Sequence, residues 1–240
     1  MPAAIIENFI VGIVTSITTA VAVWLWNKFR QSKLLNRKAA FFGVKPKEQC
    51  FAVMNQNPKR LNTMSHEDVQ TLIEVAKLAE EIDVELKIAP FEKFVEPPGS
   101  ATEFCLGGPD SNQRTKIHLA NFLQEIRFNP YMPGDPENIA ILIQGQEFRY
   151  EKDRSEHAIL ARIYPEPKSR PVILVSGQTA KSNRGAVHYL IENYDRALRK
   201  KFGNEKQFCL LIKLKDPTSY GYKSARLERD LTGIAFKPLK

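Results

Sequence analysis

The sequence predicts an α/β protein in which a single transmembrane helix precedes a domain with a mostly parallel sheet. Three observations lead to this prediction. An uncharged apolar stretch occupies residues 8–27, near the start of the chain. From residue 45 onward, short apolar runs alternate with amphipathic segments. Several of these runs are apolar throughout, which is typical of strands that are covered on both faces.

The apolar stretch, NFIVGIVTSITTAVAVWLWN, has the length and the flanking residues of a membrane anchor. About 20 helical residues span a hydrocarbon core of about 30 Å. Trp24 and Trp26 lie at its end, and five basic residues follow by position 38. The positive-inside rule therefore places residues 1–7 outside and the rest of the chain in the cytoplasm, with a bacterial inner membrane as the expected location.

Two alternatives to an anchor fit these residues less well. A cleaved signal peptide carries its basic residues before the apolar run, whereas here Glu7 precedes it and basic residues follow. A buried core helix would confine its polar residues to one face, which the Thr and Ser residues of this stretch do not do. Gly12, Ser16 and Ala20 recur at every fourth position, a spacing that leaves a homodimer open.

The remaining bulk properties indicate a cytosolic domain with a reducing environment. The net charge of +8 is divided about equally between the first 40 residues and the rest, and no interleaved basic and aromatic motif occurs, so nucleic acid is not an expected partner. Cys50, Cys105 and Cys209 each lie in an apolar run without metal-ligand spacing, which predicts buried thiols. No metal site and no cofactor are expected.

The elements after residue 45 follow from apolar runs and helical periodicity. Strands are expected at 48–56, 84–91, 103–108, 170–177 and 206–215, helices at 65–83, 111–126 and 183–202, and a strand with a turn or a hairpin at 139–151. Residues 155–167 stay ambiguous, and the tail with Tyr220 and Tyr222 is expected to form a short strand or a hairpin edge. Residues 129–138, rich in proline, form a connection.

Individual positions in the predicted helices also carry expectations. Ser65 is a good N-cap for the helix at 65–83. His66 and His118 are expected at the surface. The expected inward-facing residues are Val69, Leu72, Ile73, Ala76 and Ala79 or Glu80 in the first helix, Ile117, Leu119, Ala120, Leu123 and Ile126 in the second, and Ala186, Tyr189, Leu190 and Ala197 in the third.

This order of elements predicts four segments along the chain. They are an extracytoplasmic N-terminus at 1–7, the transmembrane helix at 8–27, a basic juxtamembrane linker at 28–44 and a cytosolic α/β domain at 45–240. With right-handed crossovers the domain would be a three-layer, Rossmann-like structure, whose sites lie beyond the carboxyl ends of its strands.

Two stretches resemble each other and form the candidate ligand site. EFCLGGPDSNQRT (103–115) and VILVSGQTAKSNRGA (172–186) both run from an apolar strand through glycine to Ser-Asn and an arginine. Glycine permits close approach of a ligand, and a helix N-terminus with hydroxyl and guanidinium groups suits an anion. The candidate ligand-binding residues are Gly107, Gly108, Ser111, Asn112, Arg114, Gly177, Thr179, Ser182, Asn183 and Arg184.

The alternative is that both stretches are only capped helices after turns. Ser and Asn are the usual N-cap residues, and glycine is common in turns. Neither stretch matches a P-loop or the GxGxxG pattern.

Catalytic residues are only weakly indicated. Asp153 and Glu156, as acid and base, and His188 are the candidates, but a charged loop is the preferred explanation for the first two. No metal-binding histidine pattern and no GxSxG motif occurs. An enzymatic role is therefore open, without a residue set that demands one.

Residues of about 100–195 resemble a group of uncharacterised bacterial Rossmann-like domains of the nucleotide-sensor type. The matching residues are Gly107, Gly108, Pro109, Ser111, Asn112 and Thr115, then Gly177, Gly185, Ala186, Tyr189 and Leu190. The resemblance implies a ligand-binding or sensor role and supplies no catalytic residues.

The expected function is that of a membrane-anchored cytosolic sensor, which binds a nucleotide-like or other anionic small molecule at the two glycine corners. The alternatives are a membrane-tethered enzyme acting on a nucleotide or a glycosidic bond, and a scaffold with no ligand. The expected partners are the lipid bilayer, through residues 8–27, and the small molecule.

Overall fold

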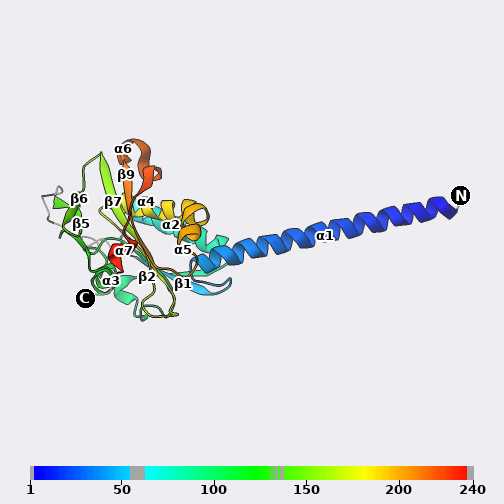
Figure 1. Cartoon of the computed structure of the whole chain (residues 1–240), viewed down its shortest axis with the longest axis horizontal. Coiled ribbons are helices and arrows are strands. Elements are labelled where there is room, and N and C mark those ends of the chain that lie inside the picture. Colours follow the sequence, from blue (N-terminus) through cyan, green and yellow to red (C-terminus); the bar gives the residue numbers. More distant parts are fainter. Residues whose placement is uncertain (1–2, 55–62, 131, 133–134, 136–137, 237–240) are drawn as a thin grey trace.

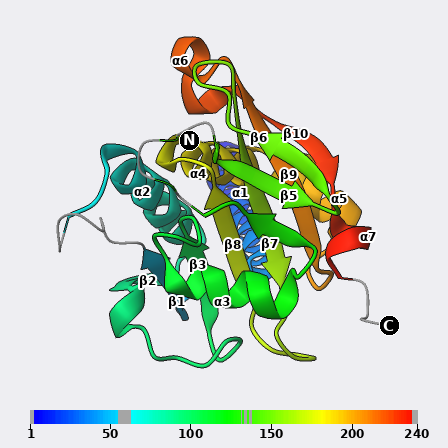
Figure 2. The ribbon, with the colours of Figure 1, turned by 90° about the vertical axis from the view of Figure 1, so that its left-hand side faces the viewer.

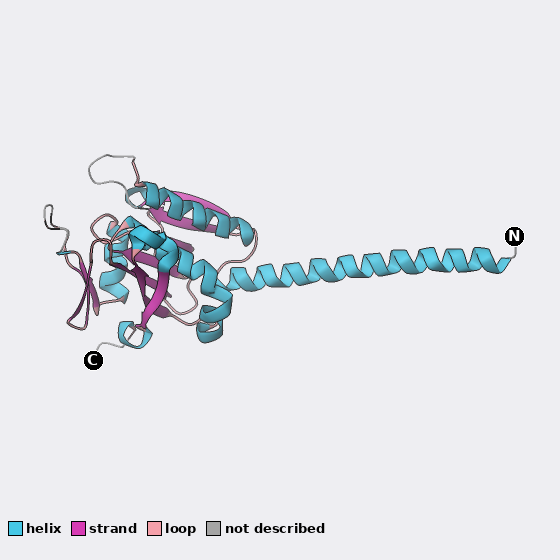
Figure 3. Cartoon of the chain, turned by 90° about the horizontal axis from the view of Figure 1, so that it is seen from above, coloured by secondary structure: helices cyan, strands magenta, loops and turns pink. Residues whose placement is uncertain are grey.

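The protein consists of one long helix and a folded α/β domain (Figure 1). The computed structural model describes residues 3–54, 63–130, 132, 135 and 138–236. Helix α1 (Ala3–Phe41) projects away from the domain as a single rod in both side views (Figures 1 and 3). It is long and apolar enough to cross a membrane, and the rest of the chain buries none of its apolar stretch.

Residues 28–41 of the predicted linker continue this helix into the domain, so the helix and the domain have no flexible joint between them. Ala39, Phe41, Phe42 and Val44 are buried. Gly43 lies two residues after the end of the helix with a φ of 71°, which suits glycine, and the Val44 N–H donates to the Ala39 carbonyl at 3.1 Å. The folded core therefore begins within the segment that the sequence indicated as a linker.

The central sheet has seven strands in the order β10-β9-β7-β8-β3-β1-β2. Strands β1, β2, β3 and β8 are parallel neighbours, β7 is antiparallel to both β8 and β9, and β10 is antiparallel to β9. The strands are β1 (Gln49–Met54), β2 (Glu85–Pro90), β3 (Thr102–Leu106), β7 (Ser155–Ile163), β8 (Val172–Gly177), β9 (Phe208–Lys215) and β10 (Ala225–Asp230).

The prediction of an α/β domain with a mostly parallel sheet is confirmed at this level, with β7 and β10 running against the others. Strand β7 comes from the segment whose state the sequence left ambiguous. The tail follows the expectation in part, since Tyr220 and Tyr222 lie in short helical turns, α6 (Pro217–Tyr220) and η4 (Gly221–Ser224), before edge strand β10. Parts of the predicted segments lie outside the described residues, namely 1–2, 55–62, 131, 133–134, 136–137 and 237–240.

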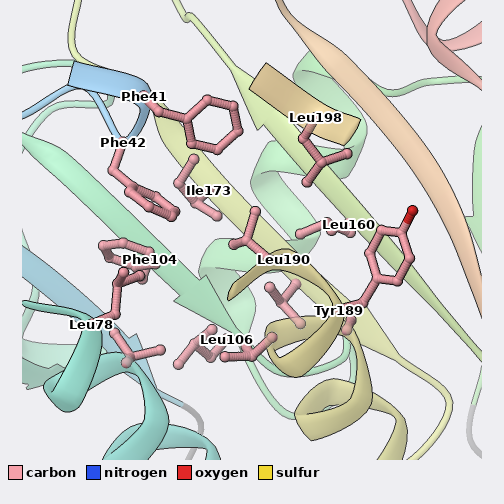
Figure 4. Close-up of a cluster of buried hydrophobic side chains, with 14 of the residues drawn as sticks. Phe41, Phe42, Leu78, Phe104, Leu106, Leu160, Ile173, Tyr189, Leu190 and Leu198 are labelled. Carbon is pink, nitrogen blue, oxygen red and sulfur yellow. The ribbon is translucent and has the colours of Figure 1, made fainter. Parts of the chain in front are cut away.

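Both faces of the sheet are covered (Figure 2). Helices α2 (His66–Glu81) and α4 (Ala180–Asn193) lie on one face together with the end of α1, around the apolar cluster of Figure 4. Helix α3 (Gln113–Phe122), α7 (Thr232–Ala235) and a three-stranded sheet cover the other. Strand β8 serves both faces, because Ile173 and Val175 point to the first cluster and Val172 and Leu174 to the second.

The small sheet consists of β4 (Ile126–Phe128), β5 (Ala140–Ile143) and β6 (Gln146–Arg149), all antiparallel. The β5–β6 connection is a hairpin through Gln144 and Gly145, which have φ of 49° and 82°. Two consecutive residues of positive φ are the requirement of a type I′ turn. The hairpin option of the sequence prediction is therefore confirmed.

Helix α2 starts as predicted but buries a different stripe. The Ser65 hydroxyl accepts the Asp68 N–H, as an N-cap should. Val69 and Ile73 are exposed, however, whereas Thr71, Val75 and Leu78 are buried. Because α2 packs against α4 as well as the sheet, its buried stripe is turned toward that helix, and the inward assignment of Val69 and Ile73 was wrong.

Three inward assignments in the other two predicted helices were also wrong. In α3, Leu119 and Leu123 are buried, but Ile117 and Ala120 are exposed, and Ile126 is buried in β4. In the third predicted helix, Ala186, Tyr189 and Leu190 are buried and Ala197 is exposed. Ala197 lies in a π-helical segment (Tyr194–Leu198), where the wider turn moves it off the helical stripe.

Arg162 fastens α1 to the domain. Its side chain is fully buried and donates to the carbonyls of Phe41 at 2.8 Å, Gly203 at 2.9 Å and Lys206 at 2.6 Å. Phe41 and Gly203 mark the ends of α1 and α5 (Arg199–Phe202), where helix carbonyls lack intrahelical partners. Burial lowers the pKa of Arg162 to about 10, so it stays charged at neutral pH. Backbone carbonyl groups, and not carboxylates, therefore accept the hydrogen bonds of this buried guanidinium.

Candidate ligand-binding site

The two glycine corners meet at one end of the sheet. Strands β3 and β8 are parallel neighbours, with Leu106 beside Val175, so their carboxyl ends lie together. A Cβ atom on Gly108 would lie 3.3 Å from the carbonyl oxygen of Gly177. The first corner therefore packs directly against the second.

A pocket of about 280 Å³ opens at this junction, and we call it the corner pocket. Five predicted ligand-binding residues line it, namely Gly108, Ser111, Gly177, Thr179 and Asn183. The other five, Gly107, Asn112, Arg114, Ser182 and Arg184, do not. The remaining lining residues are Asp68, Pro109, Asp110, Phe128, Asn129, Ile139, Gln178 and Ala180.

In the first corner, Gly107 and Asn112 hold the turn and the helix. Gly107 has a φ of 115°, and its N–H donates to the Val175 carbonyl at 3.0 Å. The Asn112 oxygen accepts the Arg114 and Thr115 N–H groups, while its amide donates to the Leu106 carbonyl at 2.9 Å. Because Asn112 is fully buried and so engaged, its role is that of the N-cap of α3.

In the second corner, the N-cap of α4 is Thr179 rather than Ser182 or Asn183. Thr179 and Ser182 form a reciprocal capping box. The Asn183 oxygen accepts the Gly177 N–H at 2.6 Å, and a Cβ on Gly177 would lie 2.9 Å from the Asn183 nitrogen. Glycine at 177 thus allows α4 to start against the end of its strand.

The two Ser-Asn pairs are consequently not equivalent, which corrects the correspondence drawn from the sequence. Asn112 precedes the first turn of α3, whereas Ser182 and Asn183 lie inside α4, three and four residues after its N-cap. The arginines also differ in position, since Arg114 is two residues after the N-cap of α3 and Arg184 is five residues after that of α4.

Arg114 is held away from the corner pocket by an acidic partner. Its guanidinium makes two parallel hydrogen bonds to Glu103, at 2.9 Å from Nε and 2.7 Å from Nη2, and lies 4.6 Å from the ring centre of Phe94. A bidentate ion pair between side chains that are 13% and 2% exposed is costly to break. The expectation that Arg114 contacts the ligand is not supported by this geometry.

Arg184 is engaged in the same way on the other side of the sheet. It donates to Glu74 at 2.9 Å and to Glu67 at 3.0 Å, both on α2, and lies 3.6 Å from the ring centre of Tyr222. This arrangement fixes α4 against α2. Arg184 is therefore a structural ion-pair partner in this structure and not part of the pocket wall.

Glu103 also bonds to His118, and both are buried under α3. His118 Nε2 lies 3.0 Å from Glu103, and its side chain is fully buried, so the expected surface position was wrong. Burial raises the pKa of Glu103, but hydrogen bonds from His118 and Arg114 outweigh this and hold it below its ordinary value. The charge of the arginine explains why a carboxylate is tolerated in an apolar layer.

Glu103, Cys105 and His118 place metal-ligating atoms within 4.8 Å of one another. Both carboxylate oxygens already accept from Arg114, and burial raises the pKa of Cys105 well above its ordinary value. A thiol in that state does not form the thiolate that metals bind. The residues therefore fit a hydrogen-bonded network better than a metal centre.

The three weak catalytic candidates do not form one group. Asp153 is exposed in a turn and accepts from Thr218 at 2.6 Å. His188 packs edge-on against Tyr222, outside the corner pocket. Glu156 is buried and accepts a hydrogen bond from the pocket residue Thr179. Burial raises its pKa although the Thr179 hydroxyl lowers it.

The charge inside the corner pocket has two sources. Among the described residues that line it, the charged side chains are those of Asp68 and Asp110. The N–H groups of Ala180 and Lys181, at the start of α4, have no acceptor among the described residues, and a helix N-terminus carries partial positive charge. Carboxylates and the N-terminus of α4, with Ala180, therefore contribute to the same pocket wall.

Several wall residues were not found from the sequence. Phe128, Asn129 and Ile139 come from the small sheet, whose position over the corner no local pattern encodes. Gln178 accepts the His157 N–H and donates to the Phe148 carbonyl, both at 2.7 Å, which ties this sheet to β7. Asp110 lies inside the first corner, so its proximity could have been inferred from the motif itself.

A larger, open hollow of about 1100 Å³ lies at the base of α1. It is lined by Ala40, the residues 43–45 and 164–171, and Asn204, Glu205 and Gln207. It contains no predicted site residue, and its Arg170 is paired with Glu48 at 2.8 Å. The corner pocket, although smaller, is where the sequence pattern and the geometry coincide.

The chain matches none of the protein families, curated proteins or solved structures with which it was compared. The similarity to bacterial Rossmann-like domains accordingly stays a prediction from sequence, and the function has to be argued from the site.

Proposed function

We propose that this protein is a single-pass membrane sensor whose Rossmann-like cytosolic domain binds a small nucleotide-like molecule in the corner pocket. The observation that carries the proposal is the meeting of two glycine corners, Gly108 against Gly177, around one pocket at the carboxyl ends of parallel strands. Ligands of open α/β sheets bind at that edge.

The pocket chemistry narrows the class of ligand. An anionic group would accept from the N–H group of Ala180, which lines the pocket and has no acceptor among the described residues. Asp68 and Asp110 suit sugar hydroxyls, which donate to carboxylates. A volume of about 280 Å³ is at the small end of ligand sites, which favours a nucleoside- or sugar-phosphate-sized molecule over a dinucleotide.

Helix α4 offers a route from the pocket to α1. It starts at the pocket, and its π-helical continuation ends at the base of α1. There Tyr194 packs 5.9 Å from the Phe41 ring and 6.1 Å from the Phe42 ring, and Asp195 pairs with Arg37 at 3.4 Å. A ligand that moves the start of α4 would shift this contact, provided that it binds the two arrangements with different affinity.

The basic residues after the apolar stretch support the proposed orientation in the membrane. Lys28, Arg30 and Lys33 begin where that stretch ends, which favours a cytoplasmic domain with the start of the chain outside. An inner membrane is the proposed location, and a homodimer through α1 stays open.

The binding proposal is tested by filling the pocket. Ala180 lines it at the first position of α4, so Ala180→Trp should block a ligand while the helix still forms. Calorimetric titration of the full-length protein in detergent with adenosine 5′-monophosphate, ribose 5-phosphate and ADP-ribose should show binding that weakens at least about tenfold in the variant, or about 1.4 kcal/mol.

Ala120→Trp is the matched control, because Ala120 is an exposed helical residue outside the pocket. It should bind as the wild type does. If none of the three compounds binds the wild type, or if both variants lose affinity equally, the pocket is not their site and a ligand-free scaffold is favoured.

The coupling of the pocket to α1 has its own test. Arg37→Gln removes the ion pair with Asp195, whereas Arg30→Gln changes an exposed arginine further along α1. Ligand-induced changes in hydrogen exchange at residues 34–41 should shrink in Arg37→Gln and persist in Arg30→Gln. Binding without any change at these residues in the wild type would refute signal transfer through α4.

An enzymatic function is the alternative, and Glu156 is the residue that favours it. It is the one candidate that contacts the pocket wall, and its raised pKa is typical of a general acid. Release of base from adenosine 5′-monophosphate by the full-length protein, abolished in Glu156→Gln and kept in Asp153→Asn, would support hydrolysis of a glycosidic bond over sensing.

A further inference from the structure

A second hollow lies where β9 ends and β10 begins. Figure 2 shows these two strands and α6. It measures about 530 Å³ and is lined by Lys215, Asp216, Tyr220, Lys223, Ser224 and Arg226. We call it the basic hollow, because three of its six residues are cations. It shares no residue with the corner pocket.

The sheet places one cation of the basic hollow opposite a lysine outside it. Arg226 on β10 lies directly opposite Lys213 on β9, and Lys215 is two residues further along the same face. Like charges opposite each other in an antiparallel pair are destabilising. Of these residues Lys213 has a carboxylate near it, Glu228 at 3.8 Å. The fold itself therefore maintains an unfavourable concentration of positive charge.

The cations of the basic hollow are also unpaired. Within the part of the chain that the structure describes, Lys215, Lys223 and Arg226 form no ion pair, and each is exposed. Asp216 is the single acidic residue in the wall. By contrast, the arginines of the two corners each have carboxylate partners.

Tyr220 adds an aromatic surface to this charge. It is 69% exposed, the largest exposed fraction among the aromatic residues of the folded domain that the structure describes. It lies at the end of α6, so its ring is presented at the wall of the hollow and not packed in a core. An exposed ring beside cations is the combination that binds a base together with its phosphates.

We propose that the basic hollow binds the phosphate groups of a nucleotide, with Lys215, Lys223 and Arg226 as their partners and the base stacked on Tyr220. The volume of about 530 Å³ falls within the range of small-molecule sites. The hollow is a site separate from the corner pocket, and it supplies the cationic side chains that the corner pocket lacks.

The test uses the full-length protein in detergent with Ala180→Trp, so that the corner pocket is filled. ATP, tripolyphosphate and a single-stranded oligothymidine are titrated separately. ATP should bind, and the double variant Lys223→Glu with Arg226→Glu should weaken it at least about tenfold. Lys77→Glu with Lys116→Glu changes the net charge equally at exposed positions on α2 and α3, and should leave ATP affinity unchanged.

Tyr220 separates nucleotide binding from simple attraction of anions. Tyr220→Ala should weaken ATP several-fold and leave tripolyphosphate unchanged, while Tyr220→Phe keeps the ATP affinity. The proposal is overturned by no ATP binding, by equal losses in both charge variants, or by Tyr220→Ala having no effect. Oligothymidine binding far tighter than ATP would also overturn it, in favour of a nucleic-acid surface.

Discussion

Replacing Arg162 with methionine should loosen α1 from the domain. Methionine has a similar length but no donors, so the fully buried Phe41 carbonyl loses its partner. An unsatisfied buried carbonyl costs about 1–3 kcal/mol. The carbonyls of Gly203 and Lys206 belong to exposed residues and can bond to water, so their loss costs less.

Stacking adds to this loss. The Arg162 guanidinium lies 4.6 Å from the ring centre of Phe41 and 5.1 Å from that of Phe208, contacts worth about 0.5–2 kcal/mol each. Part of this loss of stability is offset in Arg162→Met, because methionine removes a buried charge, whose burial is unfavourable. We therefore expect a net loss of about 2–4 kcal/mol, or about 5–15 °C in Tm for a chain of this size.

The assay is thermal unfolding of the full-length protein in detergent, followed by near-ultraviolet circular dichroism. Tryptophan fluorescence is unsuitable, because Trp24 and Trp26 both lie in α1. Arg154→Met is the control at an exposed arginine and should change Tm little. Arg162→Lys keeps the charge with fewer donors and should fall between. A loss below about 1 kcal/mol in Arg162→Met, or a wild-type Tm in Arg162→Lys, would refute the argument.

Three further changes test the packing and the buried carboxylates. Glu103→Gln should cost about 2–4 kcal/mol at neutral pH, since it breaks a buried ion pair. The folded pKa of Glu103 is below its ordinary 4.5, so its contribution to stability is present above pH 4.5 and is lost as the pH falls through the folded pKa. The Tm difference between wild type and variant should therefore disappear in acid. Glu156→Gln should raise Tm by about 2–4 °C at pH 7–8, or about 1 kcal/mol. The folded pKa of Glu156 is above its ordinary 4.5, so wild-type stability falls as the pH rises from 4.5 through the folded pKa. The higher Tm of the variant should therefore vanish below pH 4.5. A gain that grows in acid would contradict this. Gly185→Val should cost about 1–3 kcal/mol, because a Cβ there would lie 2.6 Å from Leu214; Gly233→Ala has open space and should be neutral in the same melting experiment.

The elements of this fold were largely predictable because they depend on local patterns. Ser65 caps α2 through a bond within three residues, and the continuous apolar run of β8 is buried in every position. The meeting of the corners follows from the parallel pairing of β3 and β8. These features can be predicted from the periodicity of apolar residues and from the rule that the carboxyl ends of parallel strands lie at the same edge of a sheet.

Side-chain partners were not predictable in the same way. Arg114 looked like a ligand contact because its acceptor, Glu103, lies in the preceding strand on the face that α3 covers. Arg184 pairs with Glu67 and Glu74, more than a hundred positions earlier. Whether an arginine is free to bind a ligand depends on tertiary neighbours, which a single sequence does not specify.

The unbroken helix between the apolar stretch and the core fixes an angle as well as a length. No glycine or proline interrupts it from Ile13 to Phe42, and each helical residue turns the chain by about 100° and advances it by about 1.5 Å. One residue added between positions 28 and 36 would thus rotate the whole domain by about a quarter turn relative to the apolar stretch. Four added residues would leave the domain rotated by only about 40° from its original orientation. If two copies pair through α1, the direction in which their pockets face one another is set by a count of residues far from either pocket.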